Sequence, residues 1–415
     1  MIGWLQLTNE QRKAVIDEAE QLSGISAKAI EKDWWVTLVL KALFQSTYRD
    51  YMVFKGGTSL SKGWNLISRF SEDIDIALDP QAFGMKYIEH PSKNHVEKLK
   101  REGCEFTSNA LRVELEKQFK KIGVSEGMIT VQAAPVPANH PDTDPQTLLV
   151  GYPSLYEPST YIADEVKIEV SVRSLRIPFT AVAIESLLHA INPKSTYAET
   201  PFLVDAVEPK KTFLEKIFLL HEEFGKPDKT KIKTERMSRH LYDLFKMMHT
   251  EIAANALADD ELYDHLIQHR EWYSRISWVD YKSLGHTTVS FLPSAEMMDD
   301  YQKDYQTMQE QMIYEDAAPF DKVITDLKLL QGKLRLKHEH KTLDEIIDTS
   351  RQEIMSDPFF VNKKEGSVCE TTVSYHTDPY LPKSPANKTV IYTVRFFYKD
   401  SQLIFESIII AGLPG

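Results

Sequence analysis

The stretch FKGGTSLSKGWNLISRFSEDIDIAL, residues 54–78, constrains the fold of this chain more than any other part of its sequence. A short apolar run, YMVF at 51–54, ends in two glycines and predicts a buried strand followed by a turn. The segment SLSKGWNLI, 59–67, predicts a short helix. The segment DIDIAL, 73–78, alternates acidic and apolar residues, which is typical of a strand with one buried face. The stretch therefore predicts a strand, a turn, a short helix and a second strand.

Two carboxylates, Asp73 and Asp75, lie at positions i and i+2 of the expected second strand, so both point to one face, about 6.5–7 Å apart along the chain. That arrangement suits one or two Mg²⁺ ions, because hard cations take oxygen ligands and accept substrate phosphates in the remaining positions. A Gly-Gly-Thr-Ser turn that opens a helix leaves backbone N–H groups for a phosphate. Each signal has a plain alternative, since acidic pairs are common at strand ends and most such turns only reverse the chain.

The same stretch closely resembles the AbiEii/AbiGii toxin family of nucleotidyltransferases, the toxins of type IV toxin–antitoxin and abortive-infection systems. This family belongs to the DNA polymerase β-like nucleotidyltransferase superfamily. Four further segments match the family in the same order: IEKDWWVTLVL upstream, then VKIEVSV, TFLEKIFLLH and RHLYDLFKM downstream. The resemblance covers roughly residues 20–250, with a vaguer likeness in the helices to about residue 340.

The resemblance implies roles for individual residues of this sequence. Asp73 and Asp75 would ligate Mg²⁺, and Glu169 would be the third metal ligand or the catalytic base. The residues that would hold the nucleotide triphosphate are Lys55, Gly56, Gly57, Thr58, Ser59, Ser71 and Lys216. Asp243 would complete the catalytic set. From periodicity alone, Glu169 reads as readily as an exposed position on a half-buried strand, with Lys167 on the same face.

Two other implied site residues also have structural alternatives. Lys216 could be an exposed residue on the face of its helix. Asp243 lies in an apolar neighbourhood, where a carboxylate needs a partner, and Arg239 or His240 could supply one without any catalytic role.

The helix that contains IEKDWW has a structural interpretation. Glu31, Lys32 and Asp33 are expected to form salt bridges on a helix face that brace the fold. Trp34 and Trp35 are expected in the core.

The predicted fold class is α+β, with an N-terminal nucleotidyltransferase-fold mixed sheet and helices, a helical middle domain and a small β-rich C-terminal segment. The expected domains are 1–205, 206–356 and 357–415, and the middle one contributes Lys216 and Asp243 to the site. Helices are expected over 8–45, with Thr8 as a cap and Gly24 as a stop, and over 93–122. Further strands are expected at 128–134, 147–152 and 165–172, and a hairpin turn at 399–401.

Composition limits the cellular setting. The start of the chain shows no signal peptide, no apolar run approaches the ~20 residues of a membrane span, and the two cysteines, Cys104 and Cys369, suggest no disulfide framework. We therefore expect a cytoplasmic protein with no membrane partner.

The charge balance bears on nucleic-acid binding. The formal charge of −12 argues against broad wrapping of a polyanion, but not against a local basic contact. The segment GKPDKTKIKTERMSRH, 225–240, holds six lysines and arginines against two acids, and reads equally well as a phosphate-tracking segment or a solvated loop.

The resemblance implies a Mg²⁺-dependent transfer of a nucleoside monophosphate from an NTP to an RNA acceptor, with tRNA 3′ ends as the best precedent and two metal ions in the site. It also implies a cognate antitoxin protein. Three other activities stay open: nucleotidylation of a protein, kinase-type phosphoryl transfer, and a non-catalytic interaction module on the same fold. For the segment 357–415, antitoxin binding, acceptor binding and capping of the helical domain are all open.

Overall fold

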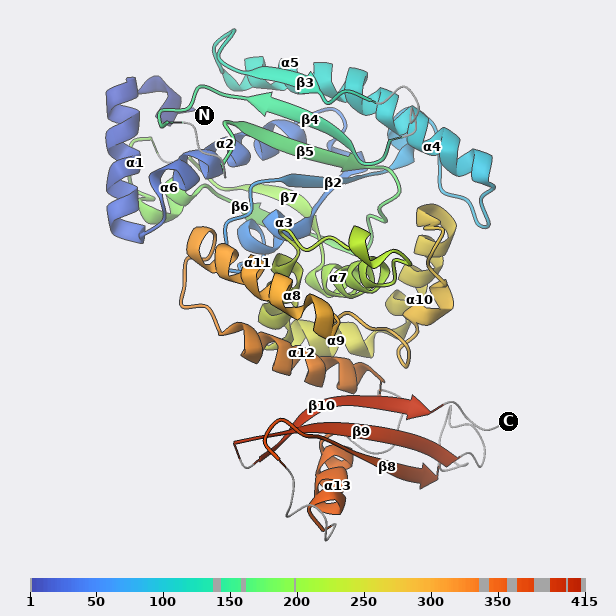
Figure 1. Cartoon of the computed structure of the whole chain (residues 1–415). Coiled ribbons are helices and arrows are strands. Elements are labelled where there is room, and N and C mark those ends of the chain that lie inside the picture. The colour runs from blue at the N-terminus through green and yellow to red at the C-terminus, as the bar shows by residue number, and fades with distance from the viewer. Residues whose placement is uncertain are drawn as a thin grey trace. The chain divides into compact units, whose positions relative to one another are not determined.

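The computed structural model of the chain describes residues 2–136, 143–157, 162–197, 199–335, 343–356, 364–376, 389–400 and 402–411. Two compact units make up the structure (Figure 1). The first unit comprises 1–212 with two later segments, 268–275 and 309–316. The second comprises 213–267, 276–308 and 317–415. The three-domain division expected from the sequence stays a prediction.

A seven-stranded mixed sheet forms the centre of the first unit. Its strands are β1 (Met52–Lys55), β2 (Ile74–Leu78), β3 (Thr130–Ala133), β4 (Gln146–Gly151), β5 (Glu165–Ser171), β6 (Phe179–Ile184) and β7 (Phe202–Val207). Their order in the sheet is β3-β4-β5-β2-β1-β7-β6. The β2–β5 and β1–β7 pairs are parallel and the other four pairs are antiparallel.

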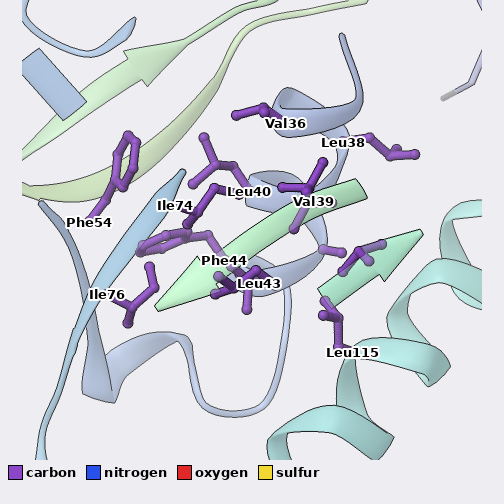
Figure 2. Close-up of a cluster of buried hydrophobic side chains, with 14 of the residues drawn as sticks. Val36, Leu38, Val39, Leu40, Leu43, Phe44, Phe54, Ile74, Ile76 and Leu115 are labelled. Carbon is purple, nitrogen blue, oxygen red and sulfur yellow. The ribbon is translucent and has the colours of Figure 1, made fainter. Parts of the chain in front are cut away.

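Alternation of apolar and polar residues gives this sheet one buried face at its centre. Ile74 and Ile76 of β2 are fully buried, whereas the aspartates beside them are partly exposed. The apolar side chains pack with Phe54 of β1 against Leu40 and Leu43 of the second helix (Figure 2). The opposite face of β2 is thereby left for polar side chains.

Helices α1 to α6 lie wholly in the first unit, as far as its residues are described. They are α1 (Asn9–Ser23), α2 (Ala27–Phe44), α3 (Gly56–Lys62), α4 (Lys93–Phe106), α5 (Arg112–Ile122) and α6 (Leu187–Ile191). The predicted cap is confirmed, because the Thr8 hydroxyl accepts from the backbone of Gln11 in a capping box. Gly24 ends α1 in the left-handed conformation, as expected. A π-helical turn joins α4 to α5, so the long helix expected over 93–122 is present with a local irregularity.

Among the described residues up to 356, the regular elements of the second unit are helices. Its helices, some of which begin or end in the first unit, are α7 (Pro209–Phe224), α8 (Ser238–Met248), α9 (Glu251–Ala258), α10 (Asp260–His269), α11 (Met298–Gln311), α12 (Phe320–Arg335) and α13 (Leu343–Ser356). Among the described residues, no helix is both long enough and apolar enough to cross a membrane.

A separate antiparallel sheet ends the chain, with strands β8 (Val368–His376), β9 (Thr389–Lys399) and β10 (Gln402–Ala411) in the order β10-β9-β8. The pairing of Lys399 with Gln402 confirms the predicted hairpin turn. The sheet has its own core, which includes Phe396 and Phe405 and is shared with Ile346 of α13.

The α+β fold class, with a mixed sheet, a helical part and a small C-terminal sheet, is confirmed. Two elements differ from the prediction. The helix expected at 59–67 begins earlier, at Gly56, and ends at Lys62, because Gly63 follows as its C-cap. Strands β6 and β7 were not predicted from the sequence.

Candidate active site

The candidate site begins where β1 turns into α3. Gly56 has a φ of +79°, a conformation that strains any residue with a Cβ. A Cβ at this position would stand 2.1 Å from Oδ2 of Asp75. The turn therefore requires glycine for two reasons, its backbone conformation and the close approach of a carboxylate.

The second glycine lies against polar groups of the loop that follows α3. A Cβ on Gly57 would stand 2.7 Å from Nη2 of Arg69 and 3.0 Å from Oγ of Ser71. The buried Thr58 hydroxyl lies 2.8 Å from Ser71 Oγ and 2.5 Å from the carbonyl oxygen of Asp73. These contacts fix the glycine turn against the start of β2.

Ser59 is also buried, and its hydroxyl donates to the carbonyl of Gly56. Thr58 and Ser59, both expected to hold a triphosphate, thus use their hydroxyls inside the turn. Their contacts position the turn. Lys55 and Ser71, which were also expected to hold the triphosphate, are partly exposed. That these residues bind nucleotide stays a prediction.

The predicted carboxylates form a row on the polar face of the sheet. Asp75 is the register partner of Glu169 on the parallel strand β5 and of Lys55 on the antiparallel strand β1. Neighbouring strands lie about 4.8 Å apart, so the three side chains stand side by side. Asp73 precedes Asp75 by two residues and shares its face. We call Asp73, Asp75 and Glu169 the acidic strip.

A lysine stands within the acidic strip. Lys167 and Glu169 alternate with buried residues on β5, and the Lys167 ammonium donates to Oε1 of Glu169. Burial lowers the pKa of Lys167, but the hydrogen bond from Glu169 and the charges of Glu169, Asp73 and Asp75 more than offset it, so the pKa is raised. The sequence places Lys167 on the correct face, but assigns it no role.

The loop between α3 and β2 is held by a segment from much later in the chain. Residues 312–314, which we call the clasp, pair with residues 68–70 of the loop, and Arg69 faces Ile313 in an isolated bridge. The Phe70 N–H donates to the Met312 carbonyl at 2.7 Å, and the Tyr314 N–H donates to the Ser68 carbonyl at 3.0 Å. The clasp lies in the segment 309–316, which belongs to the first unit together with the loop that it pairs with.

A cavity of about 530 Å³ opens on the same loop. Its lining includes Lys62, Arg69, Ser71 and Tyr314, and so combines cationic, hydroxyl and aromatic groups. Arg69 and Ser71, which line this cavity, are also the neighbours of Gly57.

Lys216 and Asp243 form a pair in the second unit. Nζ of Lys216 on α7 lies 2.9 Å from Oδ2 of Asp243 on α8, and 3.3 Å from Nδ1 of His240. Asp243 is completely buried, and 6% of Lys216 is exposed. The alternative of an exposed Lys216 is therefore wrong. Lys216 is thus one partner of Asp243. The structural alternative in which Arg239 or His240 pairs with Asp243 stays a prediction.

The three charged residues near the start of α2 brace the first unit, as predicted, but from buried positions. Glu31 accepts from the Ser154 hydroxyl and the Leu155 N–H, and Asp33 accepts from the Leu187 N–H. Further bonds join Lys32 to the carbonyls of Ala163 and Glu165, and Lys62 to Asp33. Trp34 and Trp35 are buried, as expected.

The acidic strip has the donor chemistry of a magnesium site. Mg²⁺ prefers oxygen ligands, keeps several waters and is commonly bound by one or two carboxylates together with substrate phosphates. Across the residues with described positions, no group of three or more His, Cys, Asp or Glu side chains is already arranged to hold a metal ion. The oxygen donors of the strip fit a metal that the substrate phosphates help to bind.

Comparison with known proteins extends the local match to most of the chain. The family described as "Nucleotidyl transferase AbiEii toxin, Type IV TA system" matches residues 38–326. This range includes the glycine turn, the acidic strip, the clasp and the Lys216–Asp243 pair. No curated protein matches the chain.

Proposed function

This chain belongs to the AbiEii family of nucleotidyl transferase toxins of type IV toxin–antitoxin systems, and from that premise we propose that it transfers a nucleoside monophosphate from an NTP to an RNA. The 3′ end of a tRNA is the first candidate acceptor. The observation that carries the proposal is the acidic strip, in which Asp75 and Glu169 are register partners beside a turn that only glycine fits.

In the proposed reaction, the acceptor hydroxyl oxygen attacks the α-phosphorus, the bond to the bridging oxygen breaks, and pyrophosphate leaves. Glu169 orients the hydroxyl and takes its proton. Lys55, Ser71 and the glycine turn bind the triphosphate and stabilise the charge that develops on it. That Lys216 also binds the triphosphate is what the family resemblance implies. Asp243 holds the ammonium of Lys216 in place.

Asp73 and Asp75, with Glu169, would hold Mg²⁺, and two ions are proposed. Bound there, the metal supplies Lewis-acid stabilisation of the attacking and leaving oxygens. Because the acidic strip offers only carboxylate oxygens, we propose that binding of the metal requires these carboxylates and the substrate phosphates together.

For the RNA, the basic segment 225–240 is the proposed contact. Lys229 and Lys231 are exposed, as a phosphate-tracking segment requires. Part of the positive charge is used locally, since Lys226 pairs with Glu223 and Lys231 with Asp228. The acidic total charge favours contact with one RNA end over extensive wrapping.

The family also implies a cognate antitoxin. Of the three roles considered for the segment 357–415, capping of the helices has direct contacts in its favour. Nη1 of Arg335 on α12 donates to the carbonyl of Ile408 on β10 at 2.8 Å, and Leu329 packs against the core of the C-terminal sheet. We propose that the segment stabilises the second unit, and that the protein acts in the cytoplasm.

The test combines purified protein, Mg²⁺, one α-labelled NTP at a time and total RNA. Label on a tRNA band is expected, and it should disappear in Asp73→Asn/Asp75→Asn but persist in Asp50→Asn, which changes an exposed aspartate. Label on a protein band instead would mean that the acceptor is a protein and not an RNA. With no label on either, γ-labelled ATP separates phosphoryl transfer from a non-catalytic module.

A further inference from the structure

Lys167 contacts one carboxylate of the acidic strip, Glu169, and lies near enough to Asp73 and Asp75 for their charges to act on it. The parallel register pairs Ile74 with Ile168 and Asp75 with Glu169, so Lys167 lies beside the residue that precedes Ile74, which is Asp73. Lys167 also shares a face with Glu169, to which its ammonium donates. Its side chain is 41% exposed, so it can leave this position without disrupting the core.

Charge balance explains why an ammonium is found there. Three carboxylates on adjacent strand positions repel one another, and the free energy of that repulsion rises as the groups leave bulk water. The nearby cation offsets part of this repulsion while the strip holds no metal. Any divalent ion that enters meets the positive charge of Lys167 at short range.

We propose that the ammonium of Lys167 is a built-in counter-ion of the acidic strip, that a divalent metal ion must displace it, and that Lys167 therefore weakens binding of the metal alone. The inference rests on the proposed function, which identifies the acidic strip as the metal site. It adds that Lys167 controls when a metal ion occupies this site. Metal that arrives with the phosphates of an NTP brings further oxygen ligands and so overcomes the competition. The strip is then filled mainly when the substrate is present.

The experiment measures binding of Mn²⁺ alone by electron paramagnetic resonance and of Mg²⁺ alone by calorimetry, without nucleotide or RNA. Lys167→Met removes the charge and keeps the length of the side chain. We expect it to bind either metal at least about tenfold more tightly than the unchanged protein. Lys167→Arg keeps the charge and should stay within about threefold of it.

Two controls separate the local effect from others. Lys121→Met on α5 removes the same charge from an exposed position, and its metal affinity should stay within about twofold. Thermal unfolding in EDTA checks that each variant folds, and Lys167→Gln provides a second neutral side chain if the methionine is poorly tolerated.

Unchanged metal affinity in both Lys167→Met and Lys167→Gln would overturn the inference. So would weaker affinity, which would mean that the ammonium holds Glu169 in place for the metal. Failure of the proposed function is distinguishable, because it appears as absence of label transfer in the unchanged protein, whatever the affinity of the variants for metal.

Discussion

Gly56 is the residue at which the site tolerates least change. Gly56→Ala places a methyl group where Asp75 Oδ2 now lies, and it strains a backbone with a φ of +79°. We expect nucleotidyl transfer to fall more than 100-fold, with a loss of about 1–3 kcal/mol in the free energy of unfolding. Label transfer and urea unfolding measure the two effects.

Gly24 provides a matched control. Its φ of +72° is similar, but a Cβ there would meet nothing within 4 Å. Gly24→Ala should therefore cost stability without reducing transfer. Equal loss of transfer in both variants would show that backbone strain, and not the clash with Asp75, accounts for the effect.

Glu199 should make the stability of the first unit depend on pH. Burial raises its pKa to about 7, although the charge of the buried Lys41 lowers it. The folded chain therefore holds this proton more tightly than the unfolded chain, whose pKa is near 4.5. The stabilisation is complete below about pH 4.5 and is lost as the pH rises through 7.

Glu199→Gln removes this titration. We expect the variant to gain roughly 1–2 kcal/mol relative to the unchanged protein between pH 5 and pH 8, measured by urea unfolding at both values. Glu18→Gln, on the exposed face of α1, should show no such gain. A constant difference between Glu199→Gln and the unchanged protein over this range would contradict the assignment.

At the scale of single residues, the sequence predicts which face of a strand a side chain lies on better than it predicts which residues that side chain contacts. Alternation alone places Asp73 with Asp75 on one face of their strand, and Lys167 with Glu169 on one face of theirs, because a strand has a period of two. It does not reveal that Asp75 and Glu169 are neighbours, since the register of two strands separated by 94 positions (169 − 75) is set by the whole sheet. The pairing of Lys216 with Asp243 is hidden for the same reason.

Helices α7 and α8 are joined by the buried Lys216–Asp243 pair. Lys216→Met would leave the carboxylate of Asp243 completely buried without this cation. We expect a loss of about 3–5 kcal/mol in the free energy of unfolding, because removing one partner of a buried ion pair is strongly destabilising. Replacing both residues, as Lys216→Met/Asp243→Leu, should recover part of that loss.

Lys303 on α11 offers the comparison, since its pair with Asp300 is exposed. Lys303→Met should change stability by less than about 0.5 kcal/mol. A similarly small change for Lys216→Met would mean that the α7–α8 pair has no structural importance.

The clasp is the element whose loss should affect the site from a distance in sequence. Tyr314→Pro removes the N–H that donates to Ser68, and Tyr314→Ala keeps it. We expect the proline variant to transfer nucleotide about tenfold more slowly and to exchange amide hydrogens faster at residues 68–72. If both variants behave alike, the side chain matters and the backbone pairing does not.

Helices and strands are predicted correctly where the local sequence pattern is strong. They are missed where pairing with distant strands of the sheet determines the structure. The capping box at Thr8 and the alternation of β5 are local signals. Strands β6 and β7 lack such a signal, because β6 lies at the sheet edge with an irregular burial pattern and β7 joins β1 by long-range parallel pairing.

At the scale of the whole molecule, the C-terminal sheet and α13 fold around a common core. Ile346, Ile347 and Ile354 of α13 are buried there. A chain that ends at residue 356 keeps this helix without the sheet, so we expect it to aggregate. A chain that ends at residue 342 lacks the apolar face of α13, so we expect it to stay monodisperse in light scattering. We also expect it to retain nucleotidyl transfer in the label-transfer assay. Loss of transfer in the shorter chain would give the C-terminal segment a role in the reaction.

The overall class of the molecule is predictable because its three kinds of pattern occupy separate stretches of sequence. The sequence does not predict that the segments 268–275 and 309–316 belong to the first unit. Both segments lie in a stretch that is helical in character, and nothing in their composition marks them as parts of another unit.

The clasp has a consequence for how this protein is made. A ribosome that has just produced Phe70 must add 242 more residues (312 − 70) before Met312 exists, which takes at least about 12 s at ordinary rates of translation. During that interval the nascent chain carries Asp73 and Asp75 but lacks the segment that holds the neighbouring loop. The loop beside the glycine turn therefore gains the backbone pairing that holds it only long after its own synthesis.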